Sequence, residues 1–180
     1  MSRLIEKNFL DQLPCHLDQN NLWHTFQSAY RPKHSTETAL LRVFNDPLTA
    51  SDSGSISILT LLDLNAAFNT IDHSVLLIHL ENASCVCGLA LSFFDSYVQG
   101  RTQVLTVNEA KSSPSFLTCG VPQGSVLGPV LFILYTQPLS DVTSHHSVSH
   151  HMFVDDTELY KSESPSEAFL HRPSNPAFHM

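Results

Sequence analysis

Apolar residues recur at helical spacing in two segments near the start of the chain. The first, residues 4–13, runs up to Pro14, which we expect to end a short helix. Before the second segment, Ser35 or Thr36 offers a side-chain oxygen that can cap a helix. The apolar face of that helix is predicted to comprise Ala39, Leu40, Val43 and Phe44, and Pro47 should stop it.

Residues 55–63 (S-I-S-I-L-T-L-L-D) alternate at first and then become continuously apolar. This pattern predicts a strand that is buried on both faces. The strand ends in Asp63, and a carboxylate at the end of a buried strand is costly unless it is paired, hydrogen-bonded or bound to a cation. Asp63 is therefore a candidate site residue, and the alternative is that it caps the segment that follows.

Helical spacing returns in residues 72–83 and 89–98, with Gly100 as the expected end of the second helix. Residues 102–107 and 115–118 are typical of two strands, with a turn at Asn108 and Glu109. An apolar helix is predicted for residues 130–134.

Half of the six glycines lie within residues 120–128, at Gly120, Gly124 and Gly128. Their density indicates a loop whose backbone approaches another group closely or adopts positive φ. An ordinary glycine-rich turn is the alternative, and it is weakened by two polar residues at the tip of the loop, Gln123 and Ser125.

Residues 149–160 predict a hairpin with Asp155 and Asp156 at its tip, although such a pair is common in turns for purely local reasons. The combination with Asp63 carries more weight, because these carboxylates converge only if their strands are neighbours in one sheet. Converged carboxylates repel, and they either shift a pKa or recruit a divalent cation such as Mg²⁺. Two such ions serve the in-line displacement of nucleotidyl transfer.

Composition fits one folded domain: the 180 residues are 42% hydrophobic and 14% charged. No long apolar run or signal segment is visible, so we expect no membrane contact. The four cysteines lack metal-site spacing and favour reduced, intracellular thiols. The net charge of −8, from 9 basic and 17 acidic residues, by itself argues against a protein that binds the phosphate backbone of a nucleic acid.

Four ordered motifs resemble those of LINE-type (non-LTR) retrotransposon reverse transcriptases. They are residues 26–40 (F-Q-S-A-Y-R-P-K-H-S-T-E-T-A-L), 61–73 (L-L-D-L-N-A-A-F-N-T-I-D-H), 120–129 (G-V-P-Q-G-S-V-L-G-P) and 153–160 (F-V-D-D-T-E-L-Y). The resemblance extends from about Leu4 to Tyr160. It implies an α+β fold: an incomplete right-hand polymerase palm, with an antiparallel sheet packed on helices, and partial fingers. Residues 1–50 would be fingers, 51–161 palm and 162–180 a disordered tail.

The resemblance also implies roles for matching residues. Asp63, Asp155 and Asp156 would be the catalytic, metal-binding carboxylates, with Mg²⁺ as cofactor and Mn²⁺ as its substitute. Residues expected to contact nucleotide or template are the steric gate Phe68, the loop residues Gln123 and Gly124, and the basic residues Arg31 and Lys33. The implied partners are an RNA template, a DNA primer and deoxynucleoside triphosphates.

Three departures from the family pattern accompany the resemblance. Asn69 stands where relatives usually carry an aspartate, and Phe153-Val154 replaces the commoner Tyr-Ala in what we expect to be a buried strand. Compared with the family pattern, we also expect the thumb and basic arms to be missing, which would explain the acidic charge. We therefore expect exposed apolar faces, poor solubility and little autonomous polymerase activity.

Two other functions remain open. One is a catalytically inactive relic that keeps the palm fold and binds RNA or nothing. The other is a metal-binding module, suggested by His145, His146, His150 and His151, although no second cluster at zinc-site spacing accompanies these histidines.

Overall fold

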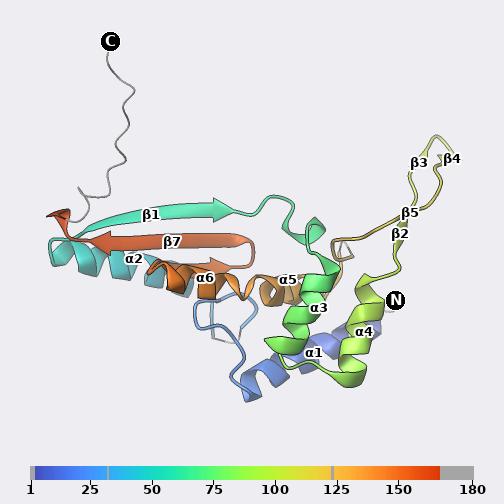
Figure 1. Cartoon of the computed structure of the whole chain (residues 1–180), viewed down its shortest axis with the longest axis horizontal. Coiled ribbons are helices and arrows are strands. Elements are labelled where there is room, and N and C mark those ends of the chain that lie inside the picture. The colour runs from blue at the N-terminus through green and yellow to red at the C-terminus, as the bar shows by residue number, and fades with distance from the viewer. Residues whose placement is uncertain (1–2, 32, 123, 167–180) are drawn as a thin grey trace, which may run out of the picture.

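A computed structural model describes residues 3–31, 33–122 and 124–166 of the chain. Its helices are α1 (Arg3–Gln19), α2 (Thr36–Asp52), the 3₁₀ turn η1 (Ala67–Asn69), α3 (His73–Asn82), α4 (Gly88–Val98), α5 (Gly128–Thr136) and α6 (Leu139–His145). Its strands are β1 (Ile56–Asp63), β2 (Thr102–Gln103), β3 (Thr106–Val107), β4 (Ala110–Lys111), β5 (Ser115–Phe116), β6 (Ser149–Phe153) and β7 (Asp156–Glu163). The mixture of helices and antiparallel strands gives an α+β fold (Figure 1).

The main sheet has the strand order β1-β7-β6, and both neighbouring pairs are antiparallel. Helix α2 packs against all three strands, and α6 packs against β6. The register places Asp63 directly opposite Asp156, so the end of β1 lies beside the start of β7 (Figure 1). The sheet thus joins two acidic segments that are far apart in the sequence.

The hydrophobic core lies beyond the sheet, among helices α1, α3, α4 and α5. Phe9 of α1 stacks on Phe93 of α4 with a centroid distance of 3.7 Å, and Leu76 and Leu131 are fully buried where α3 contacts α5. Helix α5 is buried on nearly all sides because its sequence is apolar all round. This core supports the loops that lie between it and the sheet.

Both predicted proline stops are wrong. Pro14 lies inside α1, which continues to Gln19 because Leu17 is fully buried in the core. Pro47 lies inside α2, whose capping box at Ser35 starts the helix as predicted and whose contacts with the sheet carry it to Asp52. Packing against the rest of the protein outweighs the hydrogen bond that each proline removes.

The prediction that residues 55–63 are buried on both faces is also wrong. Strand β1 forms as expected, but it is an edge strand whose Ile58 and Leu61 are 64% and 71% exposed. Exposed apolar side chains also lie on α2, at Leu41 and Leu48, so the expected exposure of apolar sheet and helix faces is confirmed.

The remaining elements largely follow the predictions. The hairpin of residues 149–160 forms as β6 and β7, and the two central helices form as α3 and α4. The segments expected as two strands, 102–107 and 115–118, instead form two short pairs, β2 with β5 and β3 with β4, although the turn at Asn108 and Glu109 is present. Strand β7 runs to Glu163, two residues into the expected tail, and residues 167–180 of that tail lie outside the described residues.

Candidate active site

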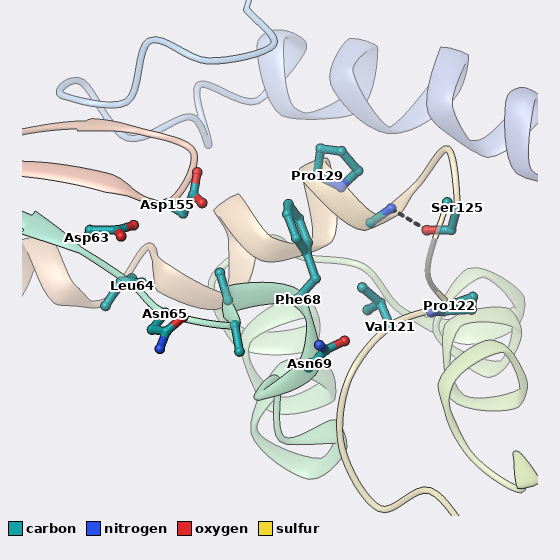
Figure 2. A pocket seen from close by; sticks show the side chains of 14 residues that line it. Asp63, Leu64, Asn65, Phe68, Asn69, Val121, Pro122, Ser125, Pro129 and Asp155 are labelled. Atoms are coloured by element: carbon teal, nitrogen blue, oxygen red, sulfur yellow. Dashed lines mark hydrogen bonds between the residues drawn. The ribbon is translucent and has the colours of Figure 1, made fainter. Parts of the chain in front are cut away.

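A pocket lies where the end of β1, the turn between β6 and β7, and the glycine-rich loop before α5 meet (Figure 2). Two of the predicted carboxylates, Asp63 and Asp155, occupy the same end of this pocket. The other lining residues are Leu64, Asn65, Ala66, Ala67, Phe68, Asn69, Val121, Pro122, Gly124, Ser125, Gly128 and Pro129.

The sheet register brings the predicted aspartates together. Asp63 is the last residue of β1, and Asp156 is its partner on β7, where directly opposed residues have Cα atoms roughly 4.5–5.5 Å apart. Asp155 belongs to the turn and lines the pocket, whereas Asp156 is exposed and is not among the lining residues. Within the described chain, no group of three or more His, Cys, Asp or Glu side chains is arranged to hold a metal ion, and this includes the three predicted aspartates taken together.

The turn that carries Asp155 has a strained backbone. Val154 adopts a φ of 60°, a left-handed conformation that is costly for a β-branched residue. Val154 therefore belongs to the turn, and our expectation that it lies in a buried strand is wrong. Such a conformation persists only when its surroundings hold it in place.

The segment after β1 places Phe68 in the pocket. Phe68 is half-buried and its ring lies 5.4 Å from that of Phe132 on α5, which restricts its movement. Its carbonyl accepts a hydrogen bond of 2.9 Å from the amide of Val121, so the Phe68 turn and the glycine-rich loop are held together.

The glycine-rich loop shows the close approach that its sequence predicts. A Cβ on Gly120, whose φ is 81°, would lie 3.0 Å from the carbonyl oxygen of Asn69. Gly124 has a φ of 73°, lines the pocket and is exposed. Ser125 accepts a hydrogen bond from the amide of Gly128 at the start of α5. Gln123 lies outside the described residues.

Three residues that the sequence does not mark as site residues fix this loop by hydrogen bonds to its backbone. The carbonyl of Gly120 lies 2.8 Å from Nε2 of His73 and accepts a hydrogen bond of 2.9 Å from Arg101. Buried Glu6 on α1 accepts a hydrogen bond from the amide of Val126. These residues are distant from the loop in sequence, so no local pattern could identify them.

Arg31 and Lys33 are not among the described residues that line the pocket. Nη1 of Arg31 donates to the carbonyl oxygens of His24 at 2.9 Å and Gln27 at 3.1 Å, and its guanidinium lies 5.7 Å from the centre of the Trp23 ring. Lys33 is exposed. The structure therefore does not gather these basic residues with the carboxylates.

The four histidines are not a metal cluster in the described part of the molecule. Buried His150 bonds to Thr143 and Ser140 of α6, while buried His151 on the same strand bonds to Ser28. Burial lowers the pKa of His150, and burial, with the nearby positive charge of Arg42, lowers the pKa of His151 to about 4. Both side chains act as neutral hydrogen-bonding groups of the interior.

An antiparallel sheet packed on helices, with carboxylates from neighbouring strands beside a pocket, defines an α+β, polymerase palm-like protein. Solved structures of apo telomerase from Candida Tropicalis share this fold: one has a TM-score of 0.63 at 13% identity and covers 94% of this chain and 33% of that one. A second, truncated from its C-terminal domain, has a TM-score of 0.62. The family described as reverse transcriptase (RNA-dependent DNA polymerase) matches residues 1–173, and the chain belongs to it.

Curated relatives agree with this family. The chain is 29% identical over 174 residues to a probable RNA-directed DNA polymerase from transposon X-element of Drosophila melanogaster, covering 93% of the chain and 19% of the relative. It is 28% identical over 149 residues to the RNA-directed DNA polymerase from mobile element jockey of Drosophila funebris, covering 83% and 16%. The resemblance to non-LTR retrotransposon reverse transcriptases is thus confirmed. The chain spans less than a fifth of the length of these relatives.

Among the described residues, no helix combines the length and apolar character needed to cross a membrane.

Proposed function

We propose that this chain carries the nucleotidyl-transfer site of an RNA-directed DNA polymerase. The pocket beside Asp63 and Asp155 would join deoxynucleoside triphosphates to a DNA primer on an RNA template. The observation that carries the proposal is the convergence of Asp63 with Asp155 in the turn and Asp156 at the start of β7, which depends on the antiparallel register of β1 and β7. Membership of the reverse transcriptase family supports the same chemistry.

The carboxylates of Asp63 and Asp155 fit a hard divalent cation such as Mg²⁺ or Mn²⁺. Within the described chain, neither accepts a hydrogen bond or pairs with a cationic side chain, so two like charges share one end of the pocket uncompensated. Mg²⁺ commonly binds through one or two carboxylates and completes its coordination with substrate phosphates and water, so it does not need the larger ligand group that the described residues lack. When bound, the cation would neutralise charge that develops on the transferring phosphate.

The remaining residues of the pocket would select and orient the nucleotide. The ring of Phe68, held against Phe132, would clash with a 2′-hydroxyl and so favour deoxyribose. Gly124 presents no side chain at the pocket and would allow nucleotide and template to approach the backbone. A contact between Gln123 and the nucleotide remains a prediction from the resemblance. Asp156, opposite Asp63, would complete the acidic set and raise the local negative potential. Phosphate contacts by Arg31 or Lys33 remain a prediction from the resemblance.

Binding of Mn²⁺ and primer extension test this proposal together. The wild-type chain is titrated with Mn²⁺ by electron paramagnetic resonance and assayed on an RNA template with a DNA primer. Asp63→Asn and Asp155→Asn keep the side-chain shape but remove the charge, and each should weaken Mn²⁺ binding by at least about 10-fold and abolish any extension. Asp95→Asn, at an exposed position of α4, is the matched control and should change neither.

Full Mn²⁺ binding or extension in either site variant would reject the assignment of the carboxylates. Mn²⁺ binding without primer extension by the wild type would agree both with a catalytically inactive relic and with the little autonomous activity expected of this chain, so Mn²⁺ binding alone then tests the carboxylates.

A further inference from the structure

A short segment lies along the outer edge of β6, on the side away from β7. The amide of Met152 donates to the carbonyl of Phe26 at 2.8 Å, and the amide of Ser28 donates to the carbonyl of Met152 at 3.1 Å. Gln27 and Met152 therefore form a parallel bridge. The hydroxyl of Ser28 adds a side-chain bond of 2.9 Å to His151. This edge segment, residues 26–28, holds β6 from the outside.

Arg31 closes the loop that contains the edge segment. Nη1 donates to the carbonyls of His24 and Gln27, which lie in one turn because the amide of Gln27 also donates to the carbonyl of His24. The guanidinium lies over the ring of Trp23, which is only 8% exposed. One planar group therefore fastens both ends of the turn and rests on a buried side chain.

The edge segment is well placed to control the carboxylate of Asp155. Strand β6 covers only Ser149–Phe153, and Met152, which the edge segment holds, is separated from the strained Val154 by Phe153 alone. On its other side β6 is paired with β7. Because a strained turn keeps its conformation only while the surrounding structure constrains it, release of β6 from the edge segment should let Asp155 move away from Asp63.

We propose that Arg31 is a positioning residue for Asp155, acting through the edge segment and Met152 on the turn between β6 and β7. The inference rests on the proposed function of the Asp63–Asp155 pocket. It differs from a phosphate contact, which would require the guanidinium at the pocket rather than on main-chain carbonyls.

The two roles predict opposite effects on Mn²⁺ binding in the absence of nucleotide. Removal of a positive charge lowers the Coulomb repulsion of a cation, so a phosphate-binding Arg31 predicts unchanged or slightly tighter Mn²⁺ binding in Arg31→Ala. A positioning Arg31 predicts weaker binding, because the two carboxylates no longer hold their spacing. Loss of a group that orients metal ligands typically costs on the order of 10-fold in affinity.

The experiment titrates the full chain with Mn²⁺ and follows amide hydrogen exchange at Met152 and Ser28. Arg31→Ala should weaken Mn²⁺ binding by about 10-fold and speed exchange at both amides. Arg31→Lys should restore part of the Mn²⁺ affinity and part of the protection from exchange. Its ammonium group can still donate to the carbonyls but lacks the planar geometry of the guanidinium. Lys111→Ala, which removes one positive charge from exposed strand β4, should change neither.

Mn²⁺ binding in Arg31→Ala as tight as in the wild type, or unchanged exchange at Met152 and Ser28, would overturn the inference. If Arg31→Ala does not fold, the same measurements on Arg31→Lys decide, and wild-type values for that variant overturn it. If the wild type binds no Mn²⁺, the proposed function is wrong, and the positioning role is wrong too because it depends on that function. The exchange rates then report only whether Arg31 holds the edge segment in place.

Discussion

The two outer strands of the main sheet invert the usual relation between composition and burial. Strand β1 is mostly apolar, yet Ile58 and Leu61 are largely exposed. Strand β6 contains two adjacent histidines, yet His150, His151 and Met152 are each at most 2% exposed. The histidine-bearing strand is in the interior, and the apolar strand is at the surface.

The difference follows from what surrounds each strand. Strand β6 has α6 against it, the edge segment along its outer side and β7 on the other side. Its histidines are tolerated because Thr143, Ser140 and Ser28 offer hydrogen bonds to the rings. Strand β1 is paired within the described residues only to β7. The burial of a strand is thus set by the elements that pack against it. The hydrophobic pattern shows only how much burial would stabilise the strand.

The largest effect expected from this contrast is on stability. Met152→Ala removes a fully buried side chain from β6 and should lower the free energy of unfolding by about 2–5 kcal/mol. Leu61→Ala removes a similar volume from β1 but should cost less than about 1 kcal/mol, because most of that side chain already contacts water. Urea titration of both variants measures the difference, and equal losses would contradict the contrast.

An effect of intermediate size is expected from pH, through His151. Burial, Arg42, His150 and His34 lower the pKa of its ring from 6.5 to about 4, so the folded chain remains unprotonated there while the unfolded chain takes up a proton. Stability should therefore fall as pH falls from 7 towards 4, with this histidine contributing about 1–2 kcal/mol between pH 7 and 5.

His151→Gln, which keeps a hydrogen-bonding group for Ser28, should reduce this pH dependence. The slope should not vanish, because burial also lowers the pKa of His24 and His150. His145→Gln, at an exposed position, is the control and should leave the slope unchanged. A slope in His151→Gln as steep as in the wild type would show that His151 binds protons as readily in the folded chain as in the unfolded one, which contradicts this prediction.

The same contrast explains which features could be predicted from the sequence. Helical spacing and the acidic hairpin are local patterns. The convergence of Asp63 with Asp155 is expected only on the condition that their strands are neighbours, and the family resemblance, not the local pattern, implies that condition. Local patterns could not show that packing carries α1 past Pro14, or that β1 lies at an edge. They also could not show that the guanidinium of Arg31 is occupied by carbonyl groups of its own loop.

The smallest change in the free energy of unfolding is expected from a substitution on the exposed side of β1. The same substitution should have a clearer effect on self-association. Its outer edge is long and apolar, without the lysines or prolines that commonly protect edge strands from pairing with another chain. Leu61→Lys should change the free energy of unfolding by no more than about 0.5 kcal/mol, because the side chain is exposed. It should nevertheless reduce self-association in sedimentation velocity, since a charge opposes edge-to-edge pairing.

Thr106→Lys adds the same charge to exposed strand β3, away from the main sheet, and should leave association as in the wild type. If both variants lower association equally, net charge rather than the β1 edge governs solubility, and the exposed strand is not the surface through which the chains meet.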